Sequence, residues 1–178
     1  MGGAPGAAGA VARAMTMPRA WLIANALWLQ VGWWACVLGA KVPWLLLLVP
    51  LGLAVHLKLC PARSTEVGAL LRVTLAGCML DGLLGAIGFF RFEAWPLPLW
   101  LALLWLVLAS GLRHSLAWAG WPFWRGASVG ALGGPLAYLS GAGLADVALP
   151  LGPVVTGLLL VPVWALALPL LVRLAARR

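Results

Sequence analysis

Six long apolar runs dominate the sequence, and short stretches containing polar residues or proline separate them. About 20 consecutive apolar residues make a helix long enough to cross the roughly 30 Å hydrocarbon core of a bilayer. Helices are expected because lipid offers an open backbone no hydrogen-bond partner, and the alternating pattern of a β-barrel strand is missing. We therefore predict an all-α, polytopic transmembrane helix bundle. The predicted spans are residues 20–40, 42–59, 67–90, 96–116, 123–141 and 149–174.

The composition agrees with a lipid environment. Hydrophobic residues make up 64% of the 178 residues and charged residues 9%, whereas soluble domains carry roughly 25% charged residues. The net charge of +8 does not indicate a nucleic-acid partner, because the basic residues are scattered between apolar runs and form no patch. We therefore predict membrane lipid as the partner of the outer surface, and no nucleic acid.

The basic residues also predict the orientation, because cytoplasmic loops carry an excess of Lys and Arg. With six spans and the N-terminus inside, only Lys41 and Arg91 fall on the outer side. Five spans would place the arginines after the last run outside and weaken this asymmetry. Six spans with both termini in the cytoplasm fit best. The predicted cytoplasmic set is Arg13, Arg19, Lys58, Arg63, Arg72, Arg113, Arg125, Arg173, Arg177 and Arg178.

Residues 1–19 are rich in Gly and Ala, and we expect a disordered cytoplasmic tail there, with Met15 and Met17 as alternative starts. The apolar run that follows is too long for a signal peptide and contains Asn25 and Gln30. We interpret it as a retained first helix of a single transmembrane domain over residues 20–175.

Asp81 is the most informative polar residue, because the predicted third span places it near the bilayer midplane. A carboxylate at that depth is costly, and intramembrane ionisable residues mark functional sites by default. Small and polar residues at helical spacing share its face, so this face is expected to pack against protein. They are Thr74, Cys78, Gly85 and Gly88. A functional acid and a structural hydrogen bond between helices both remain open.

Two other features are expected at the depth of Asp81. One is Gln30 in the first span, and the other is a helix break at Gly133, Gly134 and Pro135 in the fifth. Proline has no N–H, so the carbonyl of Ala131 loses its helical partner. We predict a site made of Asp81, Gln30 and the backbone carbonyls freed by the break. The alternative is that Gly133, Gly134 and Pro135 only kink the helix.

A second polar group lies nearer the cytoplasmic side of the predicted spans. Its members are Asn25, His56, Arg72, Arg113, His114 and Ser115. The arginines either extend to lipid phosphates or form a site for an anionic head group. The histidines lack the HxxxH and HxxE spacings, and Cys36, Cys60 and Cys78 form no CxxC pair, so no metal and no cofactor is predicted.

Glycine and tryptophan add two expectations. Gly126, Gly130 and Gly134 recur every four residues, which allows close approach of a second helix. We favour a partner helix within the same chain, although a second chain remains open. Several of the 12 tryptophans lie deep in the predicted spans, where they either pack or line an apolar ligand cavity. These are Trp28, Trp33, Trp34, Trp105 and Trp164.

Four segments together resemble a known family. They are NALWLQVGWWACVLGA (residues 25–40), LDGLLGAIGFFRF (80–92), PLPLWLALLWLVLASGLRHSLAW (96–118) and GGPLAYLSG (133–141). In order and wording they resemble the bacterial inner-membrane family catalogued as domain of unknown function 2878, over about residues 21–173. The resemblance implies a small multi-pass protein of the bacterial inner (cytoplasmic) membrane with no established activity.

Three functions remain open. The preferred one is binding or transport of a lipid-like or amphipathic small molecule in a cytoplasm-facing cavity. Its predicted ligand-binding residues are Asp81, Gln30, Asn25, Arg113, His114 and Arg72. The second is a structural or assembly partner of another membrane protein, through the glycine stripe. The third is a membrane-embedded lipid-modifying enzyme with Asp81 or His114 as acid or base; no P-loop, serine elbow or dinucleotide fingerprint supports any other enzyme class.

Overall fold

The computed structural model describes residues 18–92 and 97–177, and these residues form an all-α fold without a strand. The prediction of an all-α protein is confirmed. Most of the predicted N-terminal tail lies outside the described residues. The helices are α2 (Arg19–Gly39), the 3₁₀ helix η1 (Pro43–Leu47), α3 (Leu48–Leu59), α4 (Arg63–Ala86), α5 (Leu99–Leu112), the 3₁₀ helix η2 (Ala117–Gly120), α6 (Phe123–Leu144) and α7 (Pro153–Ala176).

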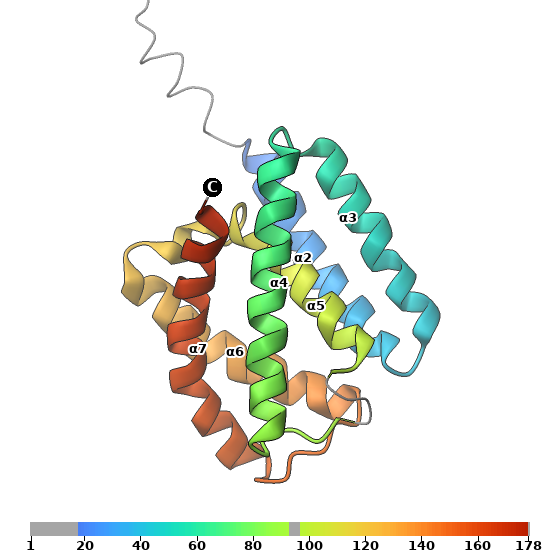
Figure 1. Ribbon diagram of the computed structural model, residues 1–178, viewed down its shortest axis with the longest axis vertical. Coiled ribbons are helices and arrows are strands. Elements are labelled where there is room, and N and C mark those ends of the chain that lie inside the picture. Colours follow the sequence, from blue (N-terminus) through green and yellow to red (C-terminus); the bar gives the residue numbers. More distant parts are fainter. Residues whose placement is uncertain (1–17, 93–96, 178) are drawn as a thin grey trace, which may run out of the picture.

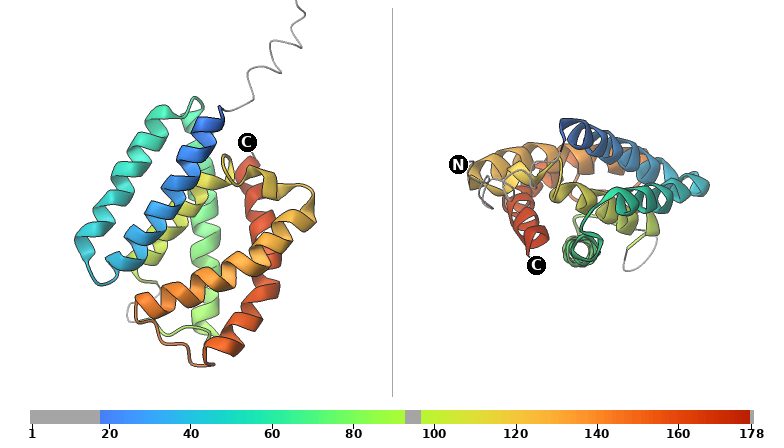
Figure 2. Two further views of the ribbon diagram at one scale, coloured as in Figure 1. Left: turned by 180° about the vertical axis from the view of Figure 1, so that it is seen from behind. Right: turned by 90° about the horizontal axis from the view of Figure 1, so that it is seen from above.

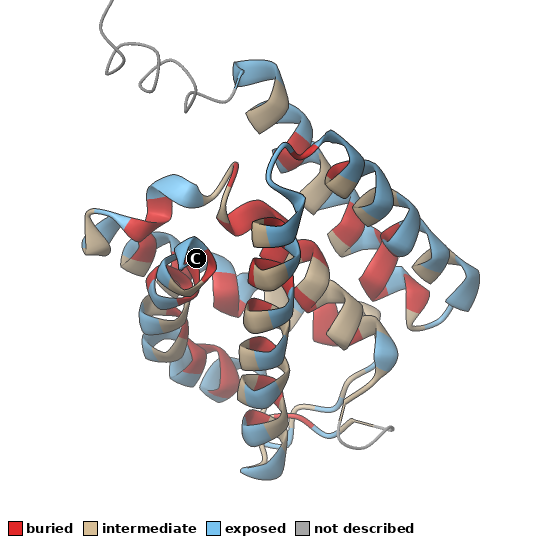
Figure 3. Cartoon of the chain, turned by 45° about the horizontal axis from the view of Figure 1, so that its top comes forward, coloured by how far each residue is buried: buried red, intermediate tan, exposed pale blue. Residues whose placement is uncertain are grey.

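Three of these helices, α2, α4 and α7, are long and apolar enough to cross a membrane. The combined η1–α3 segment and α5 are apolar but shorter. Figure 3 shows exposed residues along the outer faces of the helices, and many of these residues are large and apolar. Leu51, Met79, Leu132 and Val154 are each more than half exposed. Such a surface is suited to lipid, so the fold supports membrane association.

Successive helices run in opposite directions, so the start of α2 and the end of α7 lie at the same end of the bundle (Figure 1). We call this the terminal end, and the other, where α2 ends and α7 begins, the distal end. Figure 2 shows the bundle from behind, where α6 crosses in front of α4, and α6 packs against α7. Helix α5 packs between α2 and α4, and α3 lies on the outside of the bundle.

The glycine stripe of α6 packs against α7, as predicted. A side chain at Gly126 would meet the carbonyl of Ala119 and the ring of Pro169. A side chain at Gly130 or Gly134 would meet the backbone or the ring of Trp164. Small residues at this spacing let two helix backbones approach closely. The stripe is therefore an internal contact of one chain.

The predicted break at Gly133, Gly134 and Pro135 is wrong, because α6 continues through all three residues as one helix. Pro135 does remove one backbone donor, but membrane helices tolerate this loss where neighbouring helices support the backbone. Support comes from α7, whose Trp164 packs on Gly134, while Pro135 itself is buried.

The predicted third span is displaced by four residues. Helix α4 covers Arg63–Ala86, not residues 67–90, and it ends before Gly88, whose φ of 89° favours glycine. Asp81 therefore lies five residues before the end of α4, about 8 Å along the axis at 1.5 Å per residue. Along α4, Asp81 is nearer the distal end than the middle of the helix.

The α6–α7 contact predicts a specific sensitivity. Gly130→Ala places a methyl group against the backbone carbonyl of Trp164, which cannot move without shifting α7. We expect a loss of about 1–3 kcal/mol in stability, typical of overpacking, measured by thermal unfolding in mild detergent. Gly143→Ala is the control, because a methyl group there meets no atom within 4 Å. Equal stability of both variants would contradict the contact.

Candidate functional site

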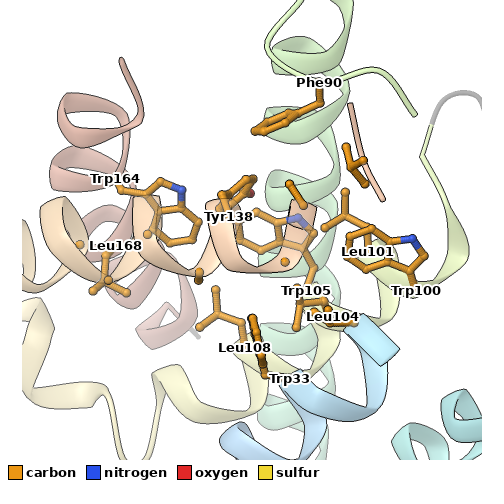
Figure 4. Close-up of a pocket in the computed structure, with 18 of the residues that line it drawn as sticks. Trp33, Phe90, Trp100, Leu101, Leu104, Trp105, Leu108, Tyr138, Trp164 and Leu168 are labelled. Carbon is orange, nitrogen blue, oxygen red and sulfur yellow. The ribbon is translucent and has the colours of Figure 1, made fainter. Parts of the chain in front are cut away.

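An apolar cavity of about 230 Å³ lies among α2, α5, α6, α7 and the loop after α4. Figure 4 shows aromatic rings around it, contributed by different elements. The aromatic lining residues are Trp33, Phe90, Phe92, Trp100, Trp105, Tyr138 and Trp164. Gly133 lies on its rim and is exposed, so the cavity communicates with the outside of the bundle. The interpretation that deep tryptophans line an apolar cavity therefore applies to Trp33, Trp105 and Trp164.

Two of these lining residues hold the buried carboxylate of Asp81. The indole Nε1 of Trp105 donates to Oδ2 over 2.7 Å, and the hydroxyl of Tyr138 donates to Oδ1. The Asp81 side chain is fully enclosed. Both carboxyl oxygens of Asp81 therefore have a hydrogen-bond partner. Among the described residues no cation forms an ion pair with it.

The sequence of α4 explains how Trp105 reaches this position. Gly77 lies one turn before Asp81, and a side chain there would overlap the Trp105 ring. On its other side the ring stacks on Trp164, with centroids 5.8 Å apart and planes inclined by 4°. Tyr138 reaches the same carboxylate from α6. Asp81 thereby joins α4, α5 and α6 directly, and α7 through the tryptophan stack.

The lining of the cavity differs from the predicted binding residues. Its lining comes from the second half of α2, the loop after α4 and most of α5, and it extends toward the terminal end through Leu116, Val129 and Leu168. Arg72, Arg113 and His114, predicted at its polar end, are not among the lining residues.

A second buried polar site is centred on Glu66, which is 1% exposed. His56 Nε2 lies 3.0 Å and His114 Nε2 3.2 Å from its Oε1, and Arg113 Nη1 lies 3.5 Å from Oε2. We call these four residues the Glu66 cluster. Glu66 occupies the first turn of α4, where the helix dipole favours a carboxylate. The cluster joins α3, α4 and the end of α5 at the terminal end of the bundle.

His56, Glu66 and His114 offer three ligand atoms within 4.8 Å of one another, close enough to hold a metal ion. However, Trp21 Nε1 donates to His114 Nδ1 over 3.2 Å. An indole N–H only donates, so the proton of a neutral His114 is on Nε2 and points at Glu66. A metal on Nε2 would need the opposite tautomer, and Arg113 already balances the carboxylate. The arrangement therefore fits a hydrogen-bonded ionic cluster better than a metal centre.

The predicted ligand-binding residues divide between several places. Arg113 and His114 belong to the Glu66 cluster. Asn25 lies next to it, donating to the Ser110 carbonyl and accepting from the backbone and hydroxyl of Ser115. Arg72 Nη2 donates to the Arg177 carbonyl.

The predicted pairings of Asp81 do not form. Gln30 is exposed on α2 and has no hydrogen bond to Asp81, whose partners are Trp105 and Tyr138. His114 bonds to Glu66, which precedes Asp81 by 15 residues on the same helix, about 22 Å along its axis. Asp81 and His114 thus cannot act on one substrate atom.

Sequence reasoning missed Glu66 and Tyr138 as site residues, and it named Trp105 for the cavity but not as a partner of Asp81. Glu66 fell one residue before the predicted third span, although an acidic residue in a first helical turn was an available signal. Tyr138 is the only tyrosine in the chain and follows Pro135 by one helical turn. For the pairing of Trp105 with Asp81, 24 residues apart, no local signal exists.

Comparison with known proteins gives one finding at the level of family. The model of a family described as protein of unknown function (DUF2878) matches residues 22–170, which include both polar sites. No curated protein and no solved structure matches the chain.

The Glu66 cluster predicts a large stability effect. Glu66→Gln removes the charge that faces Arg113 and leaves that cation without its partner. Breaking a buried pair typically costs about 3–5 kcal/mol, so we expect a clear fall in the unfolding temperature in detergent. Asp146→Asn, which removes the exposed pair with Lys41, should change it little. A Glu66→Gln protein as stable as the control would contradict this role.

Proposed function

The chain belongs to the DUF2878 family of proteins of unknown function, and from its cavity we propose that it binds an apolar or amphipathic, lipid-like small molecule within the bacterial inner membrane. The observation that carries this proposal is the aromatic cavity built on the hydrogen-bonded Asp81. Ligand pockets are typically apolar and aromatic with a few convergent polar groups.

The lining determines which ligands fit. Its side chains are apolar except for Trp105, Tyr138 and the indole N–H groups of the other tryptophans. A strongly polar metabolite would lose its hydrogen bonds to water there without replacement, at a cost of several kcal/mol. A lipid-like molecule loses nothing on leaving the bilayer for this cavity, and the exposed Gly133 at the rim gives it a route from the side.

We further propose six membrane spans with both termini in the cytoplasm. The alternating helix directions support this topology, and so does the distribution of charge. The helix ends at the terminal end carry Arg19, Lys58, Arg63, Arg125 and Arg173, whereas the distal connections carry Lys41 and Arg91. By the positive-inside rule the terminal end is then cytoplasmic.

The alternatives have less support. The glycine stripe, which was the argument for an assembly partner, is occupied by α7. The acid–base pair proposed for a lipid-modifying enzyme would require Asp81 and His114 near one atom, and they lie near opposite ends of α4. Binding, alone or as a step of transport, is the function that uses the cavity.

Mass spectrometry of small molecules that co-purify in mild detergent tests the proposal. Wild-type protein should carry a bound molecule beyond the surrounding lipid. Ala137→Phe fills the cavity from its α6 wall and should lose that molecule. Leu136→Phe is the matched control, because the neighbouring Leu136 is 65% exposed on the outer face of α6. If all three proteins carry the same molecules in the same amounts, the proposal is wrong.

A further inference from the structure

We infer that the ligand of the cavity is an amphipathic cation, with a quaternary ammonium or protonated amine seated among the aromatic rings of the lining. This inference rests on the proposed function and adds the chemical class of the ligand. It follows from three features of the described residues: the buried carboxyl group of Asp81 has no cation on the protein, the cavity walls are aromatic, and no basic side chain is among the lining residues.

Asp81 is a buried carboxyl group whose ionised form a bound cation would stabilise. The other two acidic residues with described ion pairs have their cations on the protein: Arg113 faces Glu66, and Lys41 lies 2.7 Å from Asp146. Asp81 has only two neutral donors in the described part of the chain. A buried charge in an apolar medium is costly unless it is paired. A cation bound in the cavity would sit one aromatic ring away from the carboxylate.

The aromatic walls favour the same class of ligand. A cation over the face of Trp or Tyr is attracted by the ring quadrupole, and cages of such rings recognise quaternary ammonium groups. Trp105 and Tyr138 both donate a hydrogen bond to Asp81, which draws electron density toward their rings. The same two rings line the cavity. Asp81 would therefore strengthen the attraction between a bound cation and these two lining rings, although it does not touch the ligand itself.

An anionic ligand finds no partner here. No Arg, Lys or His is among the lining residues. Arg113 belongs to the Glu66 cluster, and Arg72 bonds to the carbonyl of Arg177 at the terminal end. A neutral hydrocarbon would fit the cavity but would gain nothing from Asp81. The difference between a cation and its neutral isostere is thus the property that tests the inference.

The experiment compares benzyltrimethylammonium with neopentylbenzene, which has the same shape with carbon in place of the charged nitrogen. Binding to the full chain in an uncharged maltoside detergent is followed by tryptophan fluorescence and by thermal stabilisation, at matched free concentrations. We expect the cation to bind at least about tenfold more tightly, the gain of a desolvated cation–π contact. In Asp81→Asn this preference should fall, whereas Leu136→Phe should keep it.

The outcomes separate the two proposals. Equal affinity for the two probes in the wild-type protein overturns the cationic ligand but leaves a lipid-like ligand in place, and this comparison needs no variant that must fold. A cation preference that survives in folded Asp81→Asn overturns the role of the carboxylate. If neither probe binds and no molecule co-purifies, the proposed function fails as well.

Discussion

The structure depends on how a chain with very few acidic residues keeps two carboxylates buried among apolar helices. Asp81 is enclosed near the distal end and Glu66 near the terminal end, both on α4. Each is satisfied by donors from other helices, because an unpaired charge in this environment would cost several kcal/mol. Trp105 and Tyr138 donate hydrogen bonds to Asp81. Glu66 contacts His56, His114 and Arg113. Helix α4 thus fixes the positions of α3, α5 and α6 through two polar contacts.

The two buried carboxyl groups differ in whether the protein supplies a cation beside them. In the Glu66 cluster the carboxylate has a cation, Arg113, on the protein itself and two imidazoles within hydrogen-bond distance, and Trp21 fixes the tautomer of His114. The Asp81 contact has no cation of its own among the described residues, and its two donors form the wall of a cavity. The same physical requirement therefore gives a structural joint at one end and a candidate binding site at the other.

The sequence predicted the features that depend on composition and spacing. The all-α fold and the internal packing of Gly126, Gly130 and Gly134 follow from apolar runs and from a four-residue period. The predicted set of ligand-binding residues was wrong where it depended on which face a helix turns to its neighbours and on the residue at which a helix begins. Gln30 faces outward because α2 turns its other face to α5, and Glu66 was missed because α4 begins four residues earlier than expected. Contacts such as Trp105 to Asp81 arise only when separate helices pack, so no local pattern reveals them.

The central claim is that the cavity beside Asp81, Trp105 and Tyr138 is a ligand site. An experimental density map of the protein purified in mild detergent tests it most directly. The account predicts ordered density inside the cavity, in contact with the rings of Trp105 and Tyr138 and not accounted for by protein. A map in which side chains close the cavity, or in which Asp81 faces the surrounding lipid without its two donors, would contradict it.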